Sequence, residues 1–143
     1  MRVREALPQD AERLAELVEA VIGRRLEEEE RAQLGRNLLY FLSQGNNALL
    51  LLEDRGRVVG AASVWVRQGV FDAFPVARVD RVLLAPSHAR EEAVLMLVEQ
   101  AAALARSVGA GDFEIVLEEV PLPPELPRRL GMKALGAYRA PLR

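Results

Sequence analysis

Residues 78–109, RVDRVLLAPSHAREEAVLMLVEQAAALARSVG, predict a strand, a tight turn and a long helix. A β-prone apolar run forms the strand, and it consists of Val79, Val82, Leu83 and Leu84. Pro86 stops this run, Ser87 is the predicted N-cap of the helix, and Gly109 marks the helix end. The apolar positions of the helix follow a three- and four-residue spacing, and they are Val94, Leu97, Val98, Ala101, Leu104, Ala105 and Val108. Because the first amides of a helix lack intrahelical partners and the dipole adds positive potential, the helix start predicts an anion-binding site.

The composition limits the chemistry that the chain can perform. Its 143 residues, half of them hydrophobic, suffice for one domain with a full core, so a single domain over residues 1–143 is predicted. The chain has no cysteine, which leaves no disulfide framework and no thiol nucleophile. His88 is the sole histidine, so no metal site built on histidine or cysteine is expected. The sequence also lacks a GxSxG turn and the glycine-rich GxxxxGK and GxGxxG phosphate motifs.

Charge and hydropathy indicate the cellular compartment and the partners to expect. A net charge of -2 argues against nucleic acid as a bulk partner. The longest apolar stretch, Ala48–Leu52, is far too short to span a bilayer, and no apolar segment follows Met1 as an export signal would require. We therefore expect a cytoplasmic protein with no membrane partner.

The remaining elements complete an alternating order of strands and helices. Strands are predicted at Val3–Ala6, at Ala48–Glu53 and Arg57–Val66 around an Asp54-Arg55-Gly56 turn, at Phe113–Glu118 and at Met132–Leu142. Helices are predicted from Pro8 to Gly23 and from about Leu26, with at most a short helix in the proline-dense segment 121–127. Short connections make the second to fourth strands antiparallel, whereas the helical crossover after Arg78 makes two strands parallel. The sequence thus predicts an α+β domain with a mixed, mostly antiparallel sheet and helices on both faces.

This order resembles that of the GCN5-related N-acetyltransferase (GNAT) family. Four segments carry the resemblance: VREALPQDAERLAEL, LLEDRGRVVGAASV with Gly60 where the family often has glycine, RVDRVLLAPSHAREEAV and LPRRLGMKALGAYRAPL. Together they cover nearly the whole chain. The resemblance implies the acyl-CoA N-acyltransferase fold, acetyl-CoA as co-substrate, and an amine on a small molecule or peptide as acceptor.

The resemblance also implies which residues hold acetyl-CoA. Pantetheine would pair with the backbone of Val82, Leu83 and Leu84. The pyrophosphate would lie on the following loop and helix start, at His88, Ala89, Arg90, Glu91, Glu92, Ala93 and Val94. Two glycine positions of the family loop are occupied here by Glu92 and Val94. Arg90 or His88 would offset some of the acidic charge, although a turn histidine of this kind also fits a structural role. Retained binding of coenzyme A, and weakened or lost binding, are both compatible with this loop.

The same comparison names candidate catalytic residues. Asp80 lies where many family members carry a glutamate that takes a proton from the acceptor amine, and Glu118 corresponds loosely to a second carboxylate. A salt bridge from Asp80 to Arg78, Arg81 or another arginine, and a solvated strand end at Glu118, are the alternatives. The tyrosine that often protonates the departing thiolate corresponds to Pro127, which cannot donate a proton.

Two interpretations therefore remain. The first is an acetyl-CoA-dependent N-acetyltransferase, with Trp65, Phe71 and Phe74 along the acceptor side. Core packing or a homodimer contact would also account for these aromatic residues. The second interpretation is a GNAT-fold domain that has lost catalysis and serves in ligand binding or protein interaction.

Overall fold

The computed structural model describes residues 1–117, 120–136 and 139–143. In this part of the chain, five strands form one sheet in the order β1-β2-β3-β4-β5. Their bounds are β1 Arg2–Glu5, β2 Ala48–Asp54, β3 Arg57–Arg67, β4 Val76–Leu84 and β5 Asp112–Ile115. The first four strands pair antiparallel, and β4 pairs with β5 in parallel. The mixed, mostly antiparallel sheet predicted from the sequence is confirmed.

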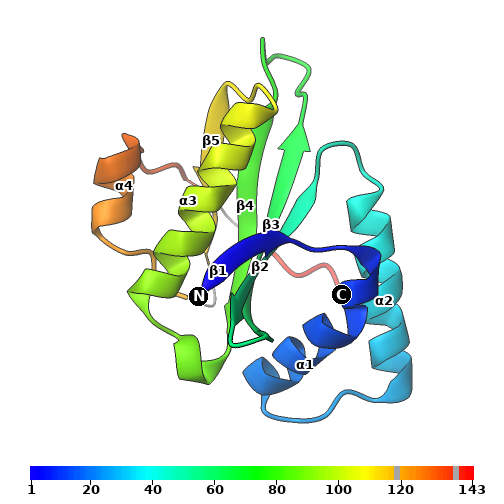
Figure 1. The fold of residues 1–143 in the computed structure, drawn as a ribbon. Helices are drawn as coiled ribbons and strands as arrows, with labels where there is room; N and C mark the ends of the chain where they lie inside the picture. The colour runs from blue at the N-terminus through cyan, green and yellow to red at the C-terminus, as the bar shows by residue number, and fades with distance from the viewer. Residues whose placement is uncertain (118–119, 137–138) are drawn as a thin grey trace.

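Helices cover both faces of this sheet, as predicted (Figure 1). The helical segments are the 3₁₀ turn η1 Pro8–Asp10, α1 Ala11–Ile22, α2 Glu28–Leu42, the 3₁₀ turn η2 Pro86–His88, α3 Glu91–Ser107 and α4 Glu125–Leu130. The helices α3 and α4 lie on one side of the sheet, and α1 and α2 lie on the other (Figure 1). None of the helices in the described residues is long and apolar enough to cross a membrane.

The core lies between the sheet and its helices. Leu50, Leu51 and Leu52 of β2 are at most 1% exposed, because this interior strand is covered on both faces. Leu17 of α1 and Leu97 of α3 are equally buried and belong to the same apolar cluster. The packed centre makes β2 and β3 a rigid support for β4, which carries the candidate site.

A β-bulge interrupts β4 at Asp80. Ser63 of β3 faces Arg81, but its neighbour Val64 faces Val79, so Asp80 is the extra residue of the pair. The bulge shifts the alternation of the strand: Val79 is buried before it, and Val82 is buried three residues later. A regular strand would place these two side chains on opposite faces.

The parallel pairing of β4 with β5 is short. It extends from Val76 opposite Asp112 to Val79 opposite Ile115. One further hydrogen bond, 2.8 Å from the Val116 amide to the Val79 carbonyl, closes the ladder. Beyond this point β4 continues to Leu84 paired with β3, so its pairing with β5 stops at Asp80, four residues before the carboxyl end of β4.

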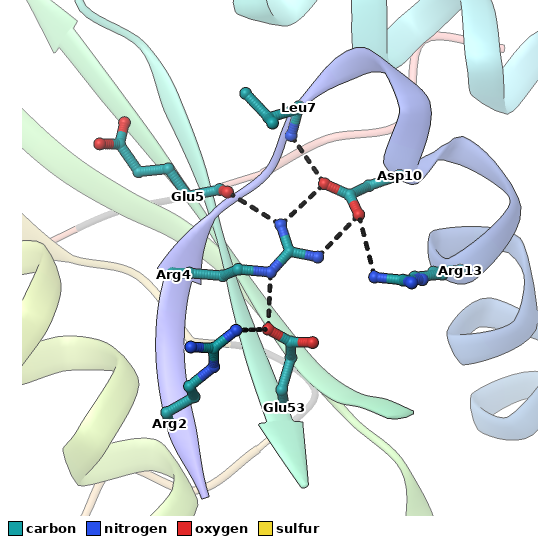
Figure 2. A network of polar contacts seen from close by, with 7 residues as sticks. All are labelled: Arg2, Arg4, Glu5, Leu7, Asp10, Arg13 and Glu53. Carbon is teal, nitrogen blue, oxygen red and sulfur yellow. Dashed lines mark hydrogen bonds and ion pairs between the residues drawn. The ribbon is translucent and has the colours of Figure 1, made fainter. Parts of the chain in front are cut away.

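An ion-pair network ties the first strand to the rest of the domain (Figure 2). Arg4 on β1 binds Asp10 of η1 with two hydrogen bonds and donates a third, 2.6 Å long, to Glu53 of β2. Asp10 also accepts a 2.8 Å hydrogen bond from the Leu7 amide. The network fixes the turn between β1 and α1.

Two local predictions are wrong. Ser87 does not cap α3: the N-cap is Arg90, and Ser87 lies in η2, where its hydroxyl is 2.8 Å from His88 Nδ1. The predicted strand Met132–Leu142 does not form in its described residues, 132–136 and 139–142. Leu135 is 68% exposed and Leu142 is 95% exposed, so this segment buries too little apolar surface to hold a strand against the sheet.

Candidate functional site

The contact that holds Asp80 in the described residues is a hydrogen bond from Ser63. The hydroxyl of Ser63 donates to Oδ1 of Asp80. Arg78, one of the partners predicted for Asp80, instead binds Glu114 of β5 through Nε at 3.0 Å and Nη2 at 2.9 Å. Among residues 1–117, 120–136 and 139–143, no hydrogen bond or ion pair is formed by Oδ2 of Asp80. One carboxylate oxygen is thus fixed and the other is available.

The register places several polar residues on the same face as this pair. Residues directly opposite on neighbouring strands share a face of the sheet. Trp65 faces Arg78, and Arg78 in turn faces Glu114. The guanidinium carbon of Arg67 lies 4.0 Å from the centre of the Trp65 ring, a cation–π contact. Ser63 and Glu114 are members of this site that the sequence analysis missed.

The second feature of the site is one edge of the carboxyl half of β4. In the described residues no strand pairs with Asp80–Leu84 on the side where β5 pairs with Val76–Val79. The side chains of Val82 and Leu84 are buried, so these residues can meet a ligand only through their backbone. An unpaired strand edge offers amide and carbonyl groups to an extended chain that contains amides. This edge has the form that pantetheine binding would need.

The start of α3 combines free amides with acidic side chains. Its N-cap Arg90 is extended, with φ -144° and ψ 161°, and its carbonyl accepts from the amides of Ala93 at 3.1 Å and Val94 at 3.4 Å. No acceptor in the described residues binds the amides of Glu91 and Glu92.

The side chains at this helix start point in different directions. Ala93 and Val94 are buried at 0% and 2% exposure, so they belong to the core and offer a ligand only their backbone. Glu91 and Glu92 are exposed. Arg90 Nε lies 3.5 Å from Glu92 Oε2, which offsets the charge of one of the two carboxylates. The first turn therefore keeps its free amides but carries one carboxylate, that of Glu91, without an ion-pair partner in the described residues.

His88 anchors the loop before α3. Its Nε2 is 2.8 Å from Oδ2 of Asp54 at the end of β2, and its Nδ1 is engaged by Ser87. The hydrogen bond from His88 holds the pKa of the Asp54 carboxyl below its usual value. Both ring nitrogens are thus occupied by protein groups, which favours the structural role for His88. Ala89, the next residue, is exposed.

The other candidate residues are placed less centrally. Glu118 lies outside the described residues. Pro127 lies half-buried in α4. Phe71 is 99% exposed and Phe74 is 64% exposed in the loop between β3 and β4, so the core-packing explanation is wrong for Phe71. Within the described residues, no three His, Asp or Glu side chains converge as a metal ion would require.

Comparisons with known proteins support the fold. No protein-family model matches the sequence, and no curated protein matches it. Among solved structures, a transcriptional regulator from Bacillus halodurans superposes with a TM-score of 0.75 at 18% identity, with 96% of each chain covered. A ribosomal-protein-alanine N-acetyltransferase from Brucella melitensis gives a TM-score of 0.70 at 17% identity, covering 100% of this chain and 99% of that one. A GNAT family acetyltransferase from Staphylococcus aureus gives 0.74 at 12% identity, covering 99% and 100%. The chain has the fold of GNAT-family acetyltransferases.

Proposed function

We propose that this chain is an acetyl-CoA-dependent N-acetyltransferase of the GNAT family that acts in the cytoplasm on an amine of a small molecule or peptide. One observation carries the proposal. Asp80 is the residue at which β4 and β5 stop pairing, and it begins the stretch of β4 whose edge is not covered by any strand in the described residues. A base and a binding edge for an amide-containing chain are therefore adjacent.

Different residues of the chain have different roles in this reaction. Acetyl-CoA supplies an activated acetyl thioester. The backbone of Val82, Leu83 and Leu84 orients it, and Asp80 Oδ2 takes the proton that the acceptor ammonium must lose before the nitrogen can attack. The nitrogen–carbon bond forms, the carbon–sulfur bond breaks, and the sulfur leaves with the electron pair of that bond, while the nitrogen gives up its second proton to water. A thiol has a pKa of about 8.5, so the leaving thiolate needs little protonation at neutral pH. This is compatible with Pro127 in place of a tyrosine acid.

The backbone at the start of α3 suits a bound diphosphate, but its acidic side chains do not. Free backbone amides at a helix start favour an anion. The ion pair with Arg90 reduces the repulsion from Glu92, whereas Glu91 opposes the ligand. We therefore expect retained but weakened binding of acetyl-CoA.

Two measurements on the purified protein test the proposal. Calorimetric titration with acetyl-CoA should give saturable binding to one site per chain. Thiol release from acetyl-CoA, followed with a thiol reagent, should rise when an acceptor amine is added. Because the chain has no cysteine, the protein itself adds no background to this assay. A tripeptide beginning with alanine is the first acceptor to test, because the fold resembles that of a ribosomal-protein-alanine N-acetyltransferase. Spermidine is the second acceptor and represents small-molecule amines. Folded protein that does not bind acetyl-CoA, or that releases no thiol with either acceptor, would contradict the proposal.

A second candidate function is a non-catalytic domain that binds a ligand or a protein. The observation in its favour is the acidic first turn of α3, where Glu91 and Glu92 occupy the start of the helix. A transcriptional regulator shares the fold, so the fold itself accommodates roles other than acetyl transfer. Absence of acetyl-CoA binding by folded protein would favour this candidate.

A further inference from the structure

We infer that Ser63 is a positioning residue for Asp80: its hydroxyl binds Oδ1 and thereby directs Oδ2 toward the acceptor amine. The inference rests on the proposed function, and it concerns a residue on a different strand from Asp80. Three features of the structure support it: a bulge, a hydrogen bond and a neighbouring ion pair.

First, the bulge creates the contact. Ser63 faces Arg81 and Val64 faces Val79, so Asp80 has no partner of its own on β3. An extra residue in a bulge redirects a side chain that a regular ladder would fix by its partner. Here the redirected carboxylate reaches the hydroxyl of Ser63, the last residue of β3 before the register shifts.

Second, the hydrogen bond leaves the carboxylate half-satisfied. A serine hydroxyl has one proton to donate, and Oδ1 of Asp80 accepts it. Oδ2 has no partner in the described residues. A carboxylate fixed by one oxygen presents the other in a single orientation, which is what a base needs to meet a bound amine.

Third, Arg78, which lies two residues before Asp80 on β4, is already engaged. Both Nε and Nη2 of Arg78 bind Oε1 of Glu114. This pair joins β4 to β5 just before the strands stop pairing. Arg78 therefore does not draw Asp80 away from Ser63.

The test combines side-chain variants with a double-mutant cycle. Ser63→Ala removes the hydroxyl, while Ser63→Thr and Ser63→Val form a pair of equal shape in which only threonine keeps a hydroxyl. Thiol release from acetyl-CoA is measured with the alanine tripeptide and with spermidine. A hydrogen bond to a charged group is typically worth more than one between neutral groups, so we expect Ser63→Ala and Ser63→Val to lower kcat about ten-fold or more. The KM for acetyl-CoA and the melting temperature should change little, and Ser63→Thr should restore most of kcat.

Two controls separate positioning from a structural role. Ser107→Ala removes a hydroxyl that donates to the Leu104 carbonyl at the end of α3, and it should leave kcat unchanged. In an Asp80→Ala background, Ser63→Ala should have no further effect, because its target is gone.

The outcomes are distinct. Turnover by the wild type that Ser63→Ala and Ser63→Val leave unchanged would overturn the inference but not the proposed function. A loss from Ser63→Ala of the same size in the Asp80→Ala background would overturn it too, since Ser63 would then act independently. Absence of turnover by the wild type with both acceptors would overturn the proposed function and the catalytic role of Ser63 with it.

Discussion

Arg4 and Asp10 form a two-pronged ion pair at the start of the domain. Nη1 of Arg4 lies 2.9 Å from Oδ2 of Asp10, and Nη2 lies 2.7 Å from Oδ1 (Figure 2). Asp10 is only 4% exposed, so water competes little for its carboxylate. Paired charges of this geometry are among the stronger hydrogen bonds in proteins. The pair holds η1, which leads into α1, against β1.

This ion pair should make the domain sensitive to acid. Mainly because of the hydrogen bonds from Arg4, the pKa of Asp10 is lowered from 3.8 to about 2. A carboxyl whose pKa is lower in the folded state stabilises the fold above its unfolded pKa, and this contribution is lost as the pH falls through the folded pKa. Asp10→Asn should therefore lower the free energy of unfolding by about 2 kcal/mol at pH 7. The difference between the two proteins should shrink between about pH 4 and pH 2.

Urea unfolding of wild type and Asp10→Asn at a series of pH values measures this effect. Protonation of Glu53, whose pKa is also lowered by Arg4, occurs in both proteins, so the difference isolates Asp10 to first order. Stability curves that stay parallel from pH 5 to pH 2 would show that the Arg4–Asp10 pair does not contribute as described.

Gly60→Ala should destabilise the centre of the sheet. A Cβ added at Gly60 would lie 2.8 Å from Cδ2 of Leu84 and 3.3 Å from Cβ of Leu52. Overpacking of a filled core typically costs about 1–3 kcal/mol. Gly35→Ala is the matched control, since its Cβ would meet only Ala11 Cβ at 3.9 Å. That substitution in α2 should stabilise the protein by up to about 1 kcal/mol. Denaturant unfolding gives both values, and an unchanged midpoint for Gly60→Ala would contradict the packing described for β3.

Glu91→Gln should tighten acetyl-CoA binding several-fold. It removes the carboxylate that has no ion-pair partner in the described residues and leaves the helix-start amides in place. The gain should decrease with added salt, because repulsion between exposed charges is screened. Glu16→Gln, an exposed position on α1, makes the same change of charge on the other side of the sheet and should have no effect. Calorimetric titration at two salt concentrations measures both variants. Equal affinity of Glu91→Gln and wild type would show that the Glu91 carboxylate points away from the ligand.

The sheet could be predicted from the sequence because its determinants are local. Alternating and continuous apolar runs gave β2, β3 and β4, and the crossover between Arg78 and Phe113 gave the parallel pair. The strand predicted after Gly131 was wrong. Its residues would form a strand only where they pack against an edge of the sheet, and Leu135 remains exposed. Ser87 resembled an N-cap, but the 3₁₀ turn Pro86–His88 includes it, and the helix begins only at Glu91.

The bond between Ser63 and Asp80 could not be predicted in the same way. It depends on the register of two strands and on a bulge, which pairing decides rather than propensity. The sequence does contain one hint: Val79 and Val82 are both apolar and three residues apart, a spacing that a regular strand cannot bury on one face. The predicted ion pair between Asp80 and Arg78 does not form, because Glu114 lies directly opposite Arg78 on β5 and binds it.

The most direct test of the account is the turnover of Asp80→Asn. The substitution keeps the shape of the side chain and a hydrogen-bond acceptor for Ser63 but removes the base. We predict a loss in kcat of at least the roughly 10²-fold expected of a missing general base, with acetyl-CoA affinity nearly unchanged. Measurement of thiol release with the alanine tripeptide across pH, beside a calorimetric titration of the same variant, gives both quantities. Turnover by Asp80→Asn at the wild-type rate throughout the pH range would contradict the account and remove Asp80 from the mechanism.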